Sequence, residues 1–266
     1  MQESFGRTEI DDFKPKNELN PDLWNKGKLD SRVRLRLMDI ADDFKDTLEI
    51  RWVKPEDVVI TGSMANYNWN DFSDIDVHVI MDYSKVYKDK KFVKSYFDAK
   101  KDLWKQEHPK LKVFGFPVEL YVEDSENPSR AGGVFSLDKN EWVKEPDEMD
   151  DSKVDYEKIE EKASDIMAEV DDLSEKLKGE KDLKKRDIIS NKFGKLFDKL
   201  KDKRKKALET KERELSPWNL VWKILRAEGY LDKIVGVINA NYDVQNTIKE
   251  SKTVIVKKSQ IQKFFN

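Results

Sequence analysis

The chain has 266 residues, no cysteine and a net charge of -3. The absence of cysteine excludes disulfides, thiolate metal sites and a cysteine nucleophile, and the small net charge does not by itself indicate a polyanionic partner. Charged residues make up 39% of the chain and apolar residues 38%, with seven Trp and thirteen Phe, a composition that argues against disorder and favours a helix-rich soluble protein.

The sequence shows neither the basic flank and apolar run of a secretory signal nor a stretch of roughly 18 apolar residues. We therefore expect a soluble protein of the cytoplasm.

The first elements along the chain are helical. Residues 20–23, NPDL, are typical of a helix start with Pro at the first helical position. After Ser31 apolar residues recur every three or four positions and predict a second helix. They are Val33, Leu37, Ile40, Phe44 and Leu48.

Strands and helices then alternate up to residue 145. A turn at 54–57 leads into the predicted strand VVIT, and Gly62-Ser63 opens a short connection. The next predicted elements are a strand at 74–81, a helix at 90–106, a strand region at 112–124 broken near Gly115 and Pro117, and a hairpin at 133–143. In the helix, Phe92, Tyr96, Ala99 and Leu103 are expected to share the packing side.

From residue 146 onward the pattern becomes helical. An apolar seam with spacings of three and four predicts a long helix from Tyr156 to Leu177, and a similar pattern resumes at Ile189. The break near 179–182 makes the two an antiparallel hairpin. Ser216-Pro217 begins another helix that ends at Gly229, and a further helix is expected at 231–239.

Two aspartates stand where a strand tolerates them least. Along 74–81, Asp74, Asp76 and His78 share one face while apolar residues form the other. Two carboxylates on one face repel each other unless a cation lies between them. Oxygen ligands of this kind suit Mg²⁺ bound together with substrate phosphates.

A third acid is available on a later strand. In PVELYVE, Glu119, Tyr121 and Glu123 face away from the apolar residues. If this strand lies beside the first, Glu119 reaches the two aspartates, and three carboxylates can hold two metal ions. Gly62-Ser63 permits close backbone approach to a phosphate.

These residues resemble the polymerase-β-like nucleotidyltransferase superfamily. The resemblance rests on Gly-Ser, ten residues, Asp-Ile-Asp and a later acid in a strand, and covers about residues 58–122. It implies that Gly62 and Ser63 bind the nucleotide, and that Asp74, Asp76 and Glu119 bind two Mg²⁺ ions and carry catalysis. The chain also looks similar to nucleotidyltransferase-domain proteins of large tailed phages.

The expected fold is α+β. An N-terminal arm (1–24) precedes a nucleotidyltransferase domain with a small mixed sheet flanked by helices (25–145), an all-α domain with a long antiparallel hairpin (146–246) and a C-terminal tail (247–266). The resemblance implies an Mg²⁺-dependent enzyme that transfers an NMP from an NTP such as ATP to an acceptor hydroxyl and releases pyrophosphate.

Several alternatives stay open at this point. The acceptor is RNA or tRNA, slightly favoured, or a protein hydroxyl as in toxin–antitoxin pairs, a second nucleotide or a small molecule. A non-catalytic nucleotide- or partner-binding scaffold is the rival function. Many relatives carry Asp as the third acid. The side chain of Glu119 is longer and can shift the geometry, so Glu123 stays a rival to Glu119. The preferred NTP and the oligomeric state are not indicated.

Residues beside the motif and the charge runs also have two interpretations each. His78 is expected at the edge of the site, and Tyr67 and Trp69 either stack on a base or pack the loop. Residues 184–206 carry a net charge of +8, and residues 145–175 carry a net charge of -11. Pairing between the two helices is favoured over RNA binding, and 201–206 is the best candidate for a phosphate contact.

Overall fold

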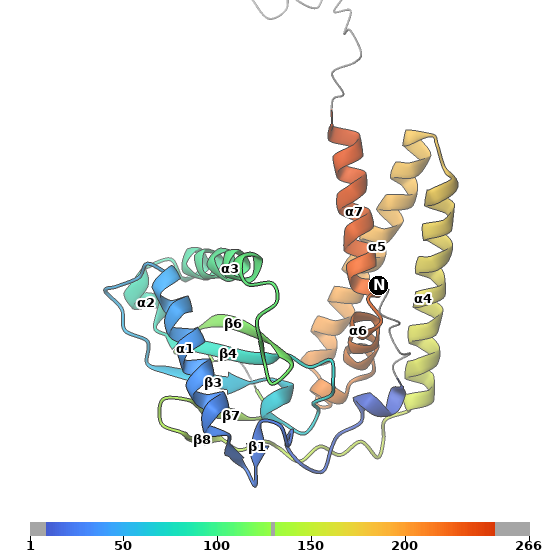
Figure 1. Cartoon of the computed structure of the whole chain (residues 1–266). Helices are drawn as coiled ribbons and strands as arrows, with labels where there is room; N and C mark the ends of the chain where they lie inside the picture. The colour runs from blue at the N-terminus through green and yellow to red at the C-terminus, as the bar shows by residue number, and fades with distance from the viewer. Residues whose placement is uncertain (1–8, 129–130, 248–266) are drawn as a thin grey trace, which may run out of the picture.

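The computed structural model describes residues 9–128 and 131–247, and its N-terminal half is built on a six-stranded sheet (Figure 1). The strand order is β5-β6-β4-β3-β7-β8, and β4 and β6 are parallel neighbours while the other neighbours are antiparallel. The strands are β3 (Asp57–Thr61), β4 (Ile75–Met81), β5 (Lys112–Val113), β6 (Phe116–Asp124), β7 (Val134–Ser136) and β8 (Glu141–Lys144).

Helices α1 (Ser31–Thr47) and α3 (Lys90–Glu107) supply much of the core that covers this sheet. The apolar face of β4 packs into that core, since Ile75, Val77 and Val79 are fully buried. The opposite face of β4 is therefore left for its polar residues, as the alternation of the sequence predicts. The short elements of this lobe are β1 (Trp24–Asn25), β2 (Lys28–Leu29), η2 (Ser63–Ala65) and α2 (Tyr83–Val86).

Two sequence-based expectations for this lobe are wrong in detail. Residues 20–23 form a turn rather than a helix, because the buried Trp24 is drawn into the β1–β2 hairpin and its Nε1 donates a hydrogen bond to the Met64 carbonyl at 2.7 Å. On α3 the buried face is one position further along than expected, on Val93, Phe97 and Trp104, whereas Phe92 and Leu103 are exposed.

The C-terminal half is all helical and contains α4 (Tyr156–Gly179), α5 (Leu183–Leu208), η3 (Arg213–Leu215), α6 (Pro217–Ala227) and α7 (Tyr230–Asn246). Helices α4 and α5 form the predicted antiparallel hairpin, and the predicted seam is buried in a second core. Helix α7 extends further than the expected 231–239. The first described element, η1 (Ile10–Phe13), also joins this second core through Phe13.

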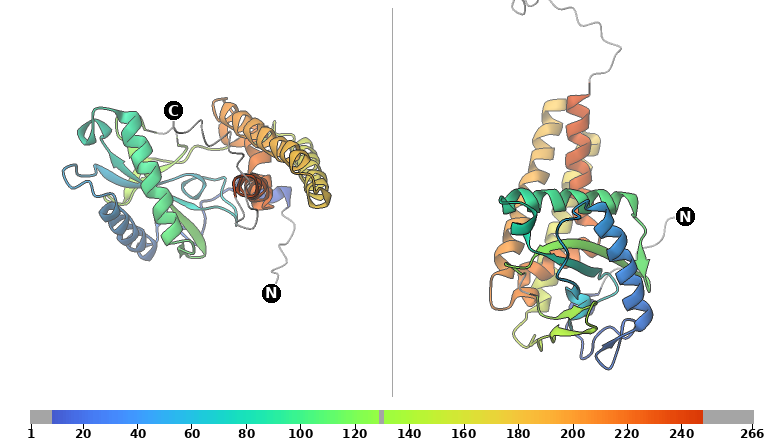
Figure 2. Two further views of the ribbon diagram at one scale, coloured as in Figure 1. Left: turned by 90° about the horizontal axis from the view of Figure 1, so that it is seen from above. Right: turned by 90° about the vertical axis from the view of Figure 1, so that its left-hand side faces the viewer.

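Seen from above, the sheet lobe and the helical lobe stand side by side (Figure 2, left). A mixed α/β lobe with a sheet, followed by a helical lobe, confirms the expected fold class. Residues 248–266, most of the expected C-terminal tail, and residues 1–8 lie outside the described residues. Within 9–128 and 131–247, the helices are all too short or too polar to span a bilayer.

Candidate active site

The two aspartates lie at the start of β4, on the face turned away from the core. Asp74 directly precedes the strand, and Asp76 is its second residue. Because neighbours along a strand point to opposite faces, burying Ile75 and Val77 turns both carboxylates to the other face. The local pattern of the strand thus fixes where the two acids point.

The parallel pairing of β4 with β6 brings in the third acid. Glu119 is the direct register partner of Asp76. One carboxylate oxygen from each of Asp74, Asp76 and Glu119 lies within 4.8 Å of the others. We call these three residues the acid cluster. The sheet therefore assembles the group of carboxylates that the sequence predicts.

Gly62 packs directly against the acid cluster from β3. A Cβ at this position would lie 2.0 Å from Oδ2 of Asp76, and the residue has φ +73°, a conformation that other residues rarely adopt. Thr61, the last residue of β3, pairs with Asp76, which explains the close approach. Only glycine fits here, so the Gly-Ser element lies within contact distance of the acids.

The electrostatics of the acid cluster match a cation site. Burial, together with the charges on Asp74 and Glu119, raises the pKa of Asp76 to about 8. A divalent cation beside Asp76 would lower this raised pKa, because a nearby opposite charge favours the ionised form of a carboxyl group. The donor set is all oxygen, which suits Mg²⁺. The residues therefore fit the metal that the sequence implies.

Glu119 is held in its ionised form by its neighbours. Burial alone would raise its pKa, but hydrogen bonds from Lys105 Nζ and the Tyr121 hydroxyl, both 2.6 Å long, lower it to about 2. Nζ of Lys101 lies 4.0 Å from Oε2 of Glu119. Glu119 is thus held as a charged carboxylate in a fixed orientation.

Glu123 does not join the acid cluster. It lies further along β6, opposite Ile80, and its Oε2 contacts Nδ1 of His78 at 2.5 Å. The His78 ring in turn lies 4.8 Å from the ring of Tyr121. The geometry favours Glu119 as the third acid and places His78 at the border of the site.

The helical lobe closes the site with an arginine. Arg226, near the end of α6, donates from Nη2 to Oδ2 of Asp74 across 152 positions of sequence. Burial lowers the pKa of Arg226, and its pairing with Asp74 outweighs this and raises it. Nothing in the local pattern WKILRAE signals this contact, so neither Arg226 nor Lys105 is predicted from the sequence as part of the site.

A cavity of about 680 Å³ lies between the lobes on the Gly62 side of the acid cluster. Its lining includes Gly62 and Asn68 from the sheet lobe, residues 147–150 and 153–155, and residues 211–215 and 217, and six of the lining residues are acids. Asn68 Nδ2 donates to Glu214 at 3.1 Å, which ties the two walls together. Its size is that of an ordinary small-ligand site.

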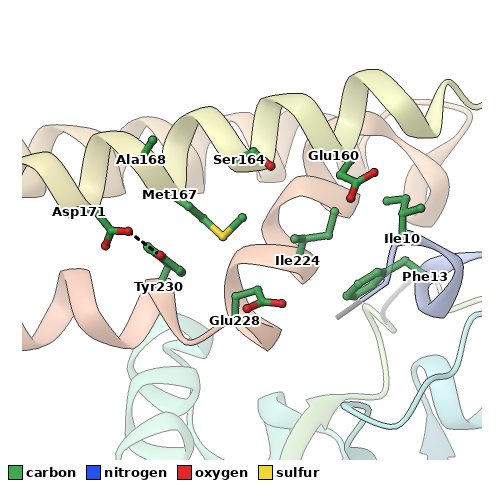
Figure 3. A pocket seen from close by; sticks show the side chains of 10 residues that line it. All are labelled: Ile10, Phe13, Glu160, Ser164, Met167, Ala168, Asp171, Ile224, Glu228 and Tyr230. Atoms are coloured by element: carbon green, nitrogen blue, oxygen red, sulfur yellow. Dashed lines mark hydrogen bonds between the residues drawn. The ribbon is translucent and has the colours of Figure 1, made fainter. Parts of the chain in front are cut away.

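A second cavity of about 400 Å³ lies within the helical lobe, between η1, α4 and the α6–α7 junction (Figure 3). Its walls are mainly apolar, and Glu160 and Glu228 lie along it. None of the acid cluster lines either cavity. The cavity beside Gly62 is the better candidate for a nucleotide because Gly62, which lines it, packs against Asp76, whereas the second cavity lies within the helical lobe.

The remaining motif residues are also placed. The Ser63 hydroxyl donates to Oγ of Ser73 at 3.0 Å and stays partly exposed. Trp69 packs against the sheet core and donates from Nε1 to the Glu18 carbonyl at 2.8 Å, so it is a packing residue. Tyr67 is partly exposed, and its carbonyl accepts from the Lys16 amide at 2.6 Å.

The favoured pairing between the acidic and basic helices is not seen. The ion pairs of α4 run within the helix or its cap, or to α7, as in Lys176–Asp172 and Lys233–Asp171. On α5, Lys206 pairs with Asp202 of the same helix. Within the described part of the chain, no Lys or Arg of α5 lies within 4.0 Å of a carboxylate of α4.

Comparison with known proteins agrees with this geometry. No curated protein and no solved structure matches the chain, so the likeness to phage proteins stays a prediction. Residues 37–145, which contain Gly62 and the acid cluster, match the family model described as "Nucleotidyltransferase domain". That match supports a relationship of the sheet lobe to the polymerase-β-like nucleotidyltransferase superfamily.

Proposed function

We propose that this protein transfers a nucleoside monophosphate from an NTP to an acceptor hydroxyl. The acceptor oxygen forms a bond to the α-phosphorus, the bond between that phosphorus and the β-phosphate oxygen breaks, and pyrophosphate leaves. The hydroxyl proton passes to solvent. The match to a nucleotidyltransferase domain supports the reaction class, and the acid cluster supports the metal-dependent form of it.

The three acids have distinct tasks in this proposal. Asp74, Asp76 and Glu119 would hold two Mg²⁺ ions, which would neutralise phosphate charge and stabilise the attacking and leaving oxygens. Asp76 is the central acid of the three, since it lies between Gly62, which follows β3, and Glu119 on β6. Glu119, with a pKa of about 2, orients the acceptor side and does not remove the proton.

The nucleotide lies on the Gly62 side. The backbone at Gly62 and the hydroxyl of Ser63 bind the β- and γ-phosphates, and the nucleoside extends into the cavity of about 680 Å³ between the lobes. Asn66 and Asn68 line that cavity and offer amide groups to the sugar or base. In this proposal, contacts of the base within this cavity determine which NTP is preferred.

One observation carries the proposal: Gly62 packs against Asp76, and three carboxylates from two neighbouring strands each bring an oxygen within 4.8 Å of the others. A scaffold without catalysis has no need to keep three acids together, because burying like charges costs stability.

The test combines binding and turnover. Each NTP is added with Mg²⁺, and thermal stability is measured; labelled NTPs are then incubated with the protein and a cell extract. Substrate binding should raise the melting temperature, and label should enter one class of acceptor. Asp76→Asn should lower turnover by about 100-fold or more, whereas the control Asp71→Asn, an exposed residue of the same loop, should not. Full turnover by Asp76→Asn would refute the proposal.

A further inference from the structure

A group of cations and aromatic rings from α5 and α6 lies next to the acid cluster. We call Phe197, Lys201, Arg204 and Trp222 the acceptor strip. Trp222 is one helical turn before Arg226, the residue that contacts Asp74, so both lie on the same side of α6. The strip therefore begins where the acids are.

The members of the strip contact one another. The guanidinium of Arg204 lies 5.0 Å from the ring centroid of Trp222, the rings of Phe197 and Trp222 are 6.0 Å apart, and Lys201 Nζ lies 5.5 Å from the Phe197 ring. Burial lowers the pKa of Arg204, and the carboxylate of Glu214, followed by Tyr121 and Asp74, acts on it in the opposite direction. Those influences place Arg204 near the acids and near β6.

The cations of the strip are available to an anion. Arg204 donates from Nε to the neutral amide oxygen of Asn219 at 3.2 Å, and Lys201 lies over a ring. Among residues 9–128 and 131–247, neither has a carboxylate within 4.0 Å. The acids of α4 do not neutralise them either, as the ion pairs of that helix show.

The sheet lobe also places cations beside an aromatic ring, close to Glu119 of the acid cluster. Lys101 Nζ lies 3.4 Å from the ring centroid of Tyr121, and Lys105 Nζ donates a hydrogen bond to Glu119. These residues belong to the β6 side of Asp76, whereas Gly62 and the nucleotide cavity belong to the β3 side. The two sides of the acid cluster thus differ, and the β6 side combines cations with aromatic faces.

We propose that the acceptor is the 3′-hydroxyl end of a single-stranded polynucleotide that lies on the acceptor strip. This inference rests on the proposed function. Alternating cations and rings are what single strands require, since the cations bind phosphates and the rings stack on bases without sequence preference. From Phe197 to Arg204 the strip covers two turns of α5, a longer surface than one phosphate group needs.

In the reaction the terminal 3′-oxygen bonds to the α-phosphorus of the NTP. Its proton passes to solvent, and pyrophosphate leaves. The product is the same strand longer by one nucleotide, so no further reactant is required.

The test measures binding and extension of labelled 12-nucleotide strands, in RNA and DNA forms, by the full chain. Binding is followed in Ca²⁺ at several salt concentrations, and extension in Mg²⁺ with each NTP. Lys201→Gln with Arg204→Gln should weaken binding by about ten-fold or more and lower the salt slope by about 2. Trp222→Leu should weaken binding by about ten-fold at any salt.

The matched control is Lys199→Gln, an exposed lysine on the other side of the same helix. It should leave binding within about two-fold. Circular dichroism and melting temperature check that each variant is folded, and the exposed Lys201→Gln alone gives a partial effect if Trp222→Leu does not fold.

The outcomes separate the two proposals. Binding that depends on the strip, with extension of a free 3′-hydroxyl and none of a dideoxy-terminated strand, supports the inference, and the RNA and DNA arms identify the sugar. Label that enters protein or small molecules, without strand binding, overturns the acceptor while the transferase stands. Strand binding through the strip with no nucleotide transferred to any acceptor overturns the transferase and leaves only a binding surface.

Discussion

Replacing Asp76 by Asn should stabilise the metal-free protein in a manner that depends on pH. The pKa of Asp76 is raised from 3.8 to about 8 by burial and by its acidic neighbours. A raised carboxyl pKa means that the folded state holds a proton that the unfolded chain has released. The charge therefore lowers the free energy of unfolding as pH rises from about 4 to about 8.

The size of the effect follows from the shift. Each pKa unit corresponds to ~1.4 kcal/mol, so a shift of about four units sets an upper bound of about 5 kcal/mol at pH 8. Water entry and side-chain movement reduce this, and we expect a gain of about 2 to 3 kcal/mol for Asp76→Asn. That is a large part of the stability of an ordinary domain.

The assay is urea unfolding in EDTA at pH 4 and pH 8, for the natural chain, Asp76→Asn and the control Asp71→Asn. The gain should be small at pH 4, which lies only just above the unfolded pKa of 3.8, and full at pH 8, where the unfolded chain is ionised. Adding Mg²⁺ should then stabilise the natural chain more than the Asn variant. A gain that is equal at both pH values, or that Asp71→Asn reproduces, would show that ionisation of Asp76 does not control stability.

Three further predictions concern the site and its support. Gly62→Ala should unfold the site region, since its Cβ would meet Asp76 Oδ2 at 2.0 Å at a positive φ; melting temperature should fall, and Asp76→Gly in the same chain should restore part of it. Arg226→Gln should strengthen Mn²⁺ binding measured by calorimetry by about three-fold or more, because Asp74 loses its competing partner; unchanged affinity would mean that the arginine does not compete. Trp24→Phe should cost about 1 to 3 kcal/mol in urea unfolding by leaving the Met64 carbonyl without its donor, and a loss no larger than that of Trp52→Phe, an exposed tryptophan, would contradict this.

Much of the sheet lobe and of the helical hairpin follows from the order of residues along the chain. The alternation in β4 already divides Asp74, Asp76 and His78 from the apolar residues, because strand neighbours point to opposite faces. The seam of α4 and the break near Gly179 likewise predict the hairpin. These features depend on spacing within one element, which the sequence shows directly.

The local signals failed where a distant part of the chain determined the outcome. Residues 20–23 look like a helix start, but burial of Trp24 against Met64 draws them into a turn. The exposed Phe92 and Leu103 have the spacing of a packing face, and only the position of α3 on the sheet selects Val93, Phe97 and Trp104 instead. The charge runs suggested pairing between α4 and α5, whereas short-range partners within each helix were closer.

The sequence by itself determined which acids share a face and which glycine precedes them, because the period of a strand and the spacing of a motif are written in one dimension. Only the tertiary structure decided that Glu119 rather than Glu123 meets Asp76, since that choice depends on the register between β4 and β6. It also decided that Arg226, 152 positions away from Asp74, completes the site. Contacts between distant segments depend on how the two lobes pack, and no local pattern of residues encodes that packing.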